Sequence, residues 1–123
     1  MNVLLDTNAL FWYLEDSPSL GKNAEVVIDK ADQVVIPTIV LLELLYLLKK
    51  KNRKEEFAVV LDKIIEKEYK IVSLDLATAI TTYDLIEKLE MHDAVIVSSA
   101  KLLGIPLVTR DRTIRKVYKN TIW

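Results

Sequence analysis

The sequence predicts an α/β fold with a mainly parallel central sheet of four to five short strands. Short apolar runs alternate along the chain with longer segments in which apolar residues recur at helical spacing. Strands that are separated by helices pair in parallel, because each helical crossover returns the chain to the same edge of the sheet. The expected strands cover residues 2–5, 34–36, 71–72, 107–108 and 121–122.

Three helices are expected in the first half of the chain. Residues 9–15 follow the first strand and include consecutive bulky apolar and aromatic side chains. The Ser-Pro-Ser segment 17–19 combines a serine cap with an early proline, which is typical of the start of a second helix. Thr38 follows Pro37 and is expected to cap a strongly apolar third helix over residues 39–50.

An amphipathic helix is expected over residues 55–67, where apolar and charged residues occupy opposite faces. Another helix begins near Asp75, and helical spacing places Leu76, Ile80 and Tyr83 on one side of it. Because a surface helix buries its apolar side, we expect these three side chains to face the core.

Three aspartates occur where an expected strand ends or an expected helix begins. Asp6 ends the first strand, and Asp111 follows the fourth strand and opens the last short helix. Asp93 opens a helix over residues 93–103, which Gly104 closes as its C-terminal cap. The carboxyl ends of parallel strands meet at one edge of a sheet, where such folds bind ligands. Each aspartate taken alone is equally well explained as a helix cap, which contributes roughly 1 kcal/mol.

Glu43 is a single acidic residue within the apolar helix expected over residues 39–50. A helix of that composition is expected to be mostly buried. A buried carboxylate is costly unless it is paired with a cation, protonated or bound to a metal ion. The alternatives to a functional role are a salt bridge to a lysine and a position on a narrow exposed stripe of the helix.

We assume that the four acids lie close together, and they then predict a metal site in which Asp6 and Asp111 anchor the principal ion. Clustered carboxylates repel one another, and a divalent cation removes that conflict. Oxygen ligands without histidine or cysteine favour Mg²⁺ or Mn²⁺ over zinc. Such ions activate water and stabilise charge on a transferring phosphoryl group, so we expect hydrolysis of a phosphate ester. The predicted catalytic and metal-binding residues are Asp6, Glu43, Asp93 and Asp111.

The composition limits the classes of protein that the sequence allows. The chain has 123 residues, of which 51% are apolar, so we expect a single domain over residues 1–123. The absence of cysteine excludes disulfides, thiolate metal sites and cysteine nucleophiles. The near balance of 17 basic and 18 acidic residues does not by itself indicate a polyanionic partner. We find neither a signal peptide nor a segment able to span a membrane, so a cytoplasmic protein is expected.

Four motifs resemble those of the PIN-domain ribonucleases. Residues 3–10 (VLLDTNAL) are similar to the first motif, and Glu43 matches the acidic position of the second. Residues 92–100 (HDAVIVSSA) resemble the third motif, and residues 107–111 (LVTRD) resemble the fourth. Each motif alone is weak, but the four occur in the family's order, and the likeness covers essentially the whole chain.

The small size resembles in particular the VapC-type toxins of prokaryotic toxin–antitoxin pairs. That resemblance implies a three-layer α/β/α sandwich and cleavage of RNA that depends on Mg²⁺ or Mn²⁺. It also implies a homodimer and a small antitoxin that covers or disrupts the site. Asn8 and Thr109 match polar positions that support the metal site in the family, and Glu90 falls where many relatives carry another acid. The chain departs from the family at Ala94 and Val95, which replace polar or basic residues of many relatives.

Several charged residues have both a functional and a structural interpretation. His92, the only histidine, stands beside Asp93, but a histidine at a helix start is more often a capping or packing residue. For Glu90 the alternative is a solvated surface role. The basic run over residues 49–54 could contact phosphates, but such a run is more often a solvated helix end. The candidate RNA contacts are the cations that flank the fourth acid, namely Arg110, Arg112, Arg115 and Lys116.

Other classes of protein have weaker support. A phosphatase that forms an aspartyl-phosphate would need a second acid two residues after Asp6, where this chain has Asn8. A dinucleotide-binding domain would need a glycine-rich loop after the first strand, and this chain has none. A receiver domain would need paired acids at the end of the first strand, where this chain has only Asp6. A non-toxin PIN nuclease that processes RNA and a PIN-like binding module without catalytic activity are the alternatives to a toxin.

Overall fold

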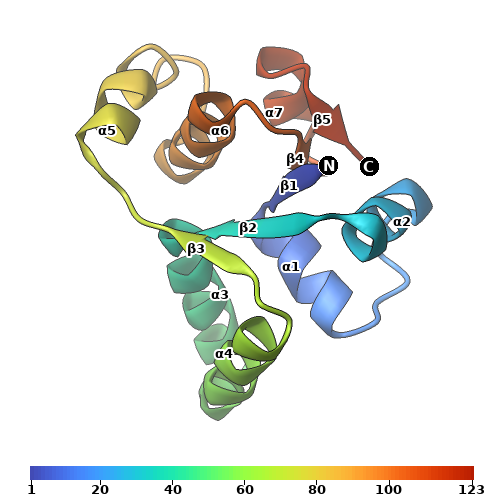
Figure 1. The fold of residues 1–123 in the computed structure, drawn as a ribbon. Coiled ribbons are helices and arrows are strands. Elements are labelled where there is room, and N and C mark those ends of the chain that lie inside the picture. Colours follow the sequence, from blue (N-terminus) through green and yellow to red (C-terminus); the bar gives the residue numbers. More distant parts are fainter.

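The computed structural model describes residues 1–123 and contains one five-stranded sheet with helices on both of its faces (Figure 1). The strands are β1 (Asn2–Leu5), β2 (Gln33–Pro37), β3 (Lys70–Val72), β4 (Leu107–Val108) and β5 (Thr121–Ile122). They lie in the order β3-β2-β1-β4-β5, and every pairing is parallel. The expected α/β fold and the three-layer α/β/α sandwich are therefore confirmed, and the sheet is parallel throughout.

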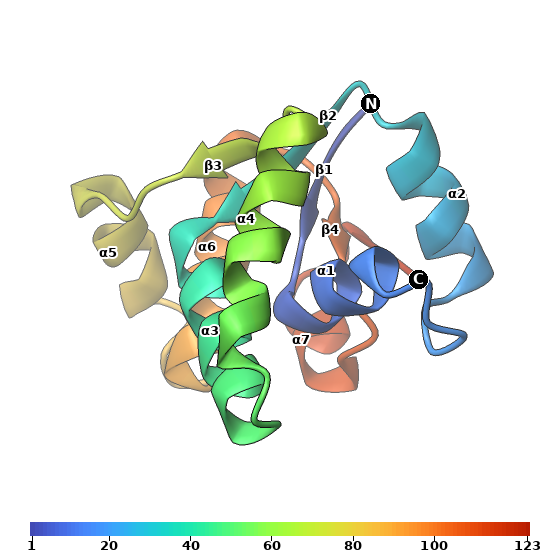
Figure 2. The ribbon, with the colours of Figure 1, turned by 90° about the horizontal axis from the view of Figure 1, so that it is seen from below.

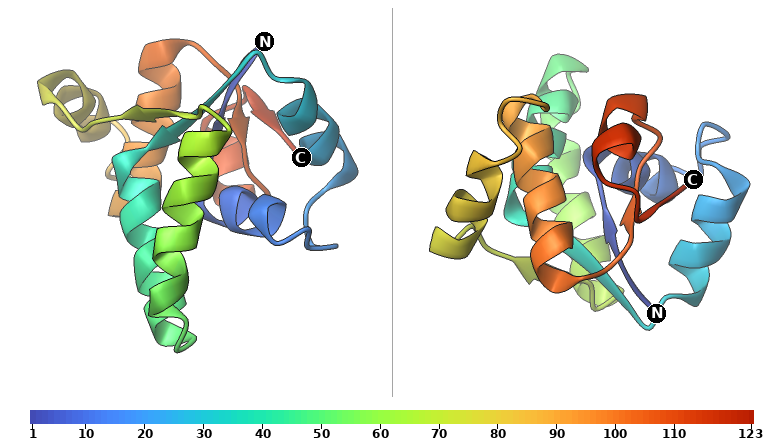
Figure 3. Two further views of the ribbon diagram at one scale, coloured as in Figure 1. Left: turned by 60° about the horizontal axis from the view of Figure 1, so that its bottom comes forward. Right: turned by 90° about the horizontal axis from the view of Figure 1, so that it is seen from above.

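The helices are divided between the two faces of this sheet. They are α1 (Thr7–Leu14), α2 (Lys22–Lys30), α3 (Thr38–Lys50), α4 (Phe57–Glu66), α5 (Leu76–Tyr83), α6 (Met91–Leu103) and α7 (Arg112–Val117), and a 3-10 turn (Lys54–Glu56) precedes α4. Figures 1 and 2 show α1, α3 and α4 on one face and α6 and α7 on the other. Figure 3 shows α5 at the rim of the molecule, against the outer side of α6. None of the helices combines the length and the apolar character that a membrane span requires.

The core extends through both layers of helices. Successive side chains of β1 point to opposite faces of the sheet, yet Val3, Leu4 and Leu5 are all fully buried. Because helices cover both faces, a parallel strand of this kind has no solvent side. Leu44 of α3 and Val97 of α6, on opposite sides of the sheet, are fully buried as well. This packing fixes α3 and α6 relative to the carboxyl ends of β1 and β4.

β1 and β4 are neighbours at the point where the chain reverses its direction across the sheet. β2 and β3 lie on one side of β1, whereas β4 and β5 lie on the other. The connections that leave β1 and β4 enter α1 and α7, which lie on opposite faces (Figure 1). In open parallel sheets, ligands bind outside the carboxyl ends of the strands at such a point. The topology therefore places a candidate ligand site beside residues 6–8 and 109–111.

Two predicted helix caps are wrong. α2 begins after Gly21, and the hydroxyl of Ser17 instead accepts a hydrogen bond from the Ser19 backbone N–H at 3.1 Å. Thr38 lies inside α3, and its hydroxyl donates to the Val72 carbonyl oxygen at 3.1 Å. A short hydroxyl side chain can find its partner within a turn or on a neighbouring strand, so its presence before a helix does not fix where the helix starts.

The predicted inward side of α5 is also wrong. Leu76, Ile80 and Tyr83 are 76%, 63% and 79% exposed, whereas Thr78, on the other side of the helix, is 5% exposed. The helix begins next to Asp75, as expected, and Asp75 caps it, with its Oδ1 accepting a hydrogen bond from the Thr78 backbone N–H at 3.0 Å. α5 therefore packs through its more polar side and leaves its apolar side uncovered.

Candidate functional site

Asp6 and Asp111 lie at the carboxyl ends of two neighbouring strands. Asp6 follows β1 and caps α1, with its Oδ1 accepting a hydrogen bond from the Ala9 backbone N–H at 2.8 Å. Asp111 lies beyond β4 and caps α7, with its Oδ1 accepting from the Ile114 backbone N–H at 2.9 Å. Because β1 and β4 pair in parallel, both carboxylates lie at the same edge of the sheet. Each capping bond uses Oδ1 only, so capping and ligand binding are compatible roles.

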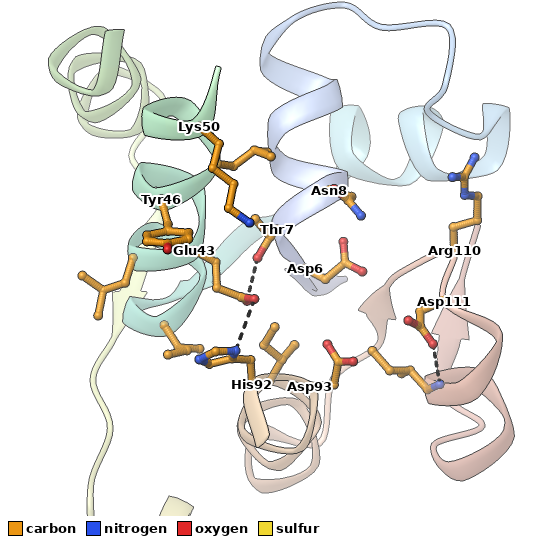
Figure 4. Close-up of a pocket in the computed structure, with 15 residues that line it drawn as sticks. Asp6, Thr7, Asn8, Glu43, Tyr46, Lys50, His92, Asp93, Arg110 and Asp111 are labelled. Carbon is orange, nitrogen blue, oxygen red and sulfur yellow. Dashed lines mark hydrogen bonds and ion pairs between the residues drawn. The ribbon is translucent and has the colours of Figure 1, made fainter. Parts of the chain in front are cut away.

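Asp93 reaches this edge from α6. The prediction that Asp93 itself opens the helix is wrong, because α6 begins at Met91 and Glu90 occupies the N-cap position. An acidic residue in the first turn of a helix interacts favourably with the helix dipole. The Asp93 carboxylate is not used for capping, and Figure 4 shows it facing Asp6 and Asp111.

Glu43 faces the same space from α3 (Figure 4). The Thr7 hydroxyl donates to its Oε1 at 2.9 Å, and Nδ1 of His92 lies 3.8 Å from its Oε2. The helix is less buried than its apolar composition predicted, because the Glu43 side chain is 29% exposed and α3 leaves Leu42 and Tyr46 open to solvent. Glu43 therefore occurs on this apolar helix because it faces the space shared with the other acids, and not because it is buried in the core.

The four acids line one cavity of about 790 Å³. They come from four separate parts of the chain, namely the ends of β1 and β4 and the helices α3 and α6. Figure 4 shows Asp6, Asp93 and Asp111 around the middle of this cavity, with Glu43 on the α3 side. The structure thus brings the whole predicted set of acids together.

Burial and mutual repulsion raise the pKa of two of these carboxylates. Asp6 is 9% exposed, and burial is the main reason that its pKa rises from 3.8 to about 6. The negative charges of Asp111 and Glu43 add to this rise, while a hydrogen bond with the Thr109 side chain opposes it. Burial, followed by the charge of Asp111, raises the pKa of Asp93 to about 6. Such shifts are typical of carboxylates that share a site without a compensating cation.

The donor set suits a hard divalent cation. Four carboxylates and the side-chain amide of Asn8 line the cavity, and Mg²⁺ and Mn²⁺ prefer oxygen ligands of this kind. No lysine or arginine forms a salt bridge with any of the four acids. In the present arrangement no three acidic or histidine side chains converge closely enough to hold one ion. Binding an ion would therefore draw the carboxylates together and relieve their repulsion.

Asn8 and Thr109 lie beside the acids, where the family resemblance implies supporting residues. Asn8 lines the cavity from the first turn of α1. Thr109 is fully buried, and its Oγ1 accepts a hydrogen bond from the Asp111 backbone N–H at 3.1 Å. Its side chain also lowers the pKa of Asp6. Thr109 therefore links the two acids at the strand ends.

Only one of the four candidate RNA contacts lines the cavity. Arg110 does so, and the centre of its guanidinium group lies 4.7 Å from the centre of the Trp12 ring. The remaining three are exposed on α7 outside the cavity, namely Arg112, Arg115 and Lys116. Any contact that these three make with a substrate would lie beyond the acidic centre.

His92 lies between two carboxylates and does not cap α6. Its Nδ1 is 3.8 Å from Oε2 of Glu43 and 3.2 Å from Oε1 of Glu90, and its ring lines the cavity. Glu90 is exposed and lies outside the cavity, in agreement with the surface alternative.

Sequence reasoning did not place three polar or aromatic residues in the cavity wall, namely Thr7, Tyr46 and Lys50, nor its five apolar residues, namely Ile39, Leu42, Leu47, Ile96 and Ile114. Thr7 contacts Glu43, and no spacing rule would have paired the two. Tyr46 and Lys50 line the cavity from α3 and follow Glu43 by three and seven positions. Such spacings put side chains on one face of a helix, so the position of Glu43 was a signal that would have found them.

Comparisons with known proteins identify the family. The model of the PIN domain matches residues 3–120, and the comparison with curated proteins finds no match. A solved toxin–antitoxin complex from Klebsiella pneumoniae is 21% identical, covering 98% of this chain and 96% of that chain (TM-score 0.73). VapBC2 from Rickettsia felis, bound to a DNA fragment from its promoter, is 25% identical, covering 99% of this chain and 96% of that chain (TM-score 0.73). VapC20 from Mycobacterium tuberculosis, a toxin that cleaves the sarcin–ricin loop, is 11% identical, covering 94% of both chains (TM-score 0.75). The chain therefore belongs to the PIN domain family and has the fold of the VapC toxins.

Proposed function

We propose that this chain is a metal-dependent endoribonuclease, the toxin of a type II toxin–antitoxin pair, which hydrolyses RNA phosphodiesters with water activated by Mg²⁺ or Mn²⁺. The observation that carries the proposal is the set of four carboxylates that face one cavity at the carboxyl ends of β1 and β4. Membership of the PIN domain family supports a nuclease.

The residues of the cavity would divide the work of holding the ion. Asp6 and Asp111 would hold it from the strand ends, with Glu43 and Asp93 completing its surroundings. A bound divalent cation lowers the pKa of a coordinated water and neutralises charge on phosphoryl oxygens. Thr7 orients the Glu43 carboxylate through its hydroxyl, and groups that orient metal ligands in this way contribute to metal affinity.

The partners expected of a toxin are a small antitoxin and a second copy of the chain. The similarity to a toxin–antitoxin complex from Klebsiella pneumoniae supports the first of these. The uncovered apolar side of α5 supports the second, because Leu76, Ile80 and Tyr83 are exposed there and large exposed apolar patches mark protein contacts.

The test is the cleavage of a labelled single-stranded RNA in Mg²⁺, in Mn²⁺ and in EDTA, with Asp6→Asn and Asp75→Asn beside the unaltered protein. Asp75 is a matched control, because it caps α5 as Asp6 caps α1 but does not line the cavity. We expect metal-dependent cutting by the unaltered chain and by Asp75→Asn. Asp6→Asn should lower the cleavage activity at least about 100-fold. Mutating a residue that only hydrogen-bonds to a metal ligand already lowers metal affinity or activity about 10- to 100-fold.

Two outcomes would contradict the proposal. Cutting that Asp6→Asn retains would show that the acidic cavity is not the active site. If the unaltered chain cuts no RNA and binds no Mn²⁺ in calorimetry, the acidic cavity is not a metal site and the non-catalytic binding module becomes the better interpretation.

A further inference from the structure

Tyr46 is an exposed aromatic residue in the wall of the acidic cavity. It is 59% exposed, yet it lines the same cavity as the four carboxylates. Figure 4 shows it on the α3 wall, between Glu43 and Lys50. Packing in the core does not explain an aromatic ring in this position, and holding a metal ion does not require one.

The α3 wall presents three different chemical groups in a row. Glu43, Tyr46 and Lys50 follow one another at spacings of three and four residues. Residues at these spacings share one face of a helix, with Cβ atoms about 5–6 Å apart. Ile39 and Leu42 line the cavity beside them. The wall therefore offers a carboxylate of the acidic centre, then an aromatic ring with an apolar surround, and then an ammonium group.

We propose that Tyr46 and Lys50 form a nucleotide subsite, in which the Tyr46 ring stacks on an unpaired base of the RNA and the Lys50 ammonium contacts a phosphate of the same strand. This subsite rests on the proposed function, because the adjacent acidic centre is what makes a nucleic acid the ligand. Aromatic rings accompanied by cations are the usual means by which proteins bind single-stranded nucleic acid.

The lysines around the ring are compatible with stacking. Nζ of Lys49 and Nζ of Lys50 lie 5.7 Å and 5.1 Å from the centre of the Tyr46 ring. Cation–π contacts at exposed sites are weaker than the stacking of a base on an aromatic ring. An incoming base therefore displaces the ammonium groups, which become free to meet phosphates and to offset the repulsion between the acidic cavity and the RNA backbone.

The subsite selects unpaired nucleotides. A base within a duplex is stacked on both of its faces, whereas bases in loops and single strands are splayed out and reach aromatic side chains. The competing occupant of this wall is a side chain of a partner protein, including a second copy of the chain.

The test measures the binding of a short fluorescein-labelled single-stranded RNA in Ca²⁺, with its integrity checked on a gel. Tyr46→Ala is compared with Tyr46→Phe, which keeps the ring, and with Ile65→Ala, which removes another exposed apolar side chain outside the cavity and outside the α5 contact. We expect Tyr46→Ala to weaken binding about 5- to 100-fold. Both other variants should bind like the unaltered protein. Lys50→Ala should lower the slope of log affinity against log salt by about 0.7.

A second arm identifies the base. One abasic site is moved along the same RNA, and we expect it to weaken binding to the unaltered protein at one position. At that position it should have no further effect on Tyr46→Ala, because the two changes remove the same contact.

Three outcomes would overturn the subsite. Binding by Tyr46→Ala that equals that of the unaltered protein would exclude stacking, and the proposed function would stand if Asp6→Asn still abolishes cutting. If Tyr46→Ala binds RNA like the unaltered protein but differs from it in mass in sedimentation, the α3 wall is a protein contact. An unaltered chain that neither binds nor cuts RNA would overturn the proposed function, and the subsite with it.

Discussion

Asp6 caps a helix and at the same time faces other carboxylates, and these two roles act on its ionisation in opposite directions. The hydrogen bond from the Ala9 N–H favours the charged form, whereas burial and the charges of Asp111 and Glu43 disfavour it. Burial is the largest effect, so the pKa rises from 3.8 to about 6. An acid whose pKa is higher in the folded than in the unfolded state destabilises the fold when it is ionised.

Asp6→Asn is therefore expected to stabilise the metal-free protein at pH 7. Between pH 3.8 and about 6 the folded state keeps a proton that the unfolded state has lost, so the free energy of unfolding decreases as pH rises through this window. A shift of about two pKa units corresponds to roughly 3 kcal/mol. Asparagine keeps the helix cap. Urea unfolding in EDTA should show a gain from Asp6→Asn on this order at pH 7 and little difference near pH 4.

Asp75→Asn is the control of opposite sign. Hydrogen bonds from Thr78 lower the pKa of Asp75, so its ionised form stabilises the fold above the pKa of the unfolded state. That contribution is lost as pH falls, and we expect Asp75→Asn to destabilise the protein at pH 7. A destabilisation by Asp6→Asn that is equal at pH 4 and pH 7 would contradict the role assigned to burial.

Thr7→Val is expected to weaken metal binding without removing a metal ligand. The Thr7 hydroxyl donates to Oε1 of Glu43 at 2.9 Å, and valine keeps the shape of the side chain but not this bond. Glu43 then loses its orientation, and Mn²⁺ affinity should fall by about 10- to 100-fold in calorimetry. Thr7→Ser should restore the affinity because it restores the donor. Equal affinities for all three proteins would exclude a positioning role for Thr7.

Among the elements, helical spacing identified α5 correctly, but it did not reveal what covers the helix. An apolar stripe has the same sequence pattern whether it meets the core or another protein, which is why Leu76, Ile80 and Tyr83 were assigned to the wrong side. α3 shows the same effect in a milder form, because its apolar composition suggested burial while Leu42 and Tyr46 are exposed. Helix position was therefore predictable, but helix environment was not.

The end of α6 gives a prediction for a single element. Gly104 closes the helix at φ 65°, in the left-handed region, and a Cβ built there meets no atom within 4 Å. The cost of Gly104→Ala is then purely conformational, and we expect a loss of roughly 1 kcal/mol in the free energy of unfolding. Gly104→Asn should lose less, because asparagine tolerates this conformation. Urea midpoints of the three proteins check the order, and an alanine variant as stable as the unaltered chain would contradict it.

For the whole molecule, the fold was more predictable than the site. Apolar strand runs and the helices between them indicated a parallel sheet, which by itself placed Asp6 and Asp111 at one edge. The pattern of strands and helices does not encode the strand order β3-β2-β1-β4-β5, which is set by packing between distant segments. That order decides which helices border the edge, so the sequence analysis had to assume that Glu43 and Asp93 reach the edge, and the family resemblance supported that assumption. Tyr46 was not predicted at the site, because the apolar composition of its helix indicated burial in the core.

The uncovered side of α5 leads to a prediction for the assembly. Ile80 and Tyr83 lie on that side, and if it is the contact between two copies, lysine at both positions would bury two charges there. We expect the unaltered chain to sediment as a dimer and the Ile80→Lys/Tyr83→Lys variant as a folded monomer. Ile65→Lys on α4 is the control, because Ile65 is similarly exposed on the other face of the sheet. An unaltered chain with the mass of a monomer, or a double variant that still dimerises, would exclude α5 as the contact.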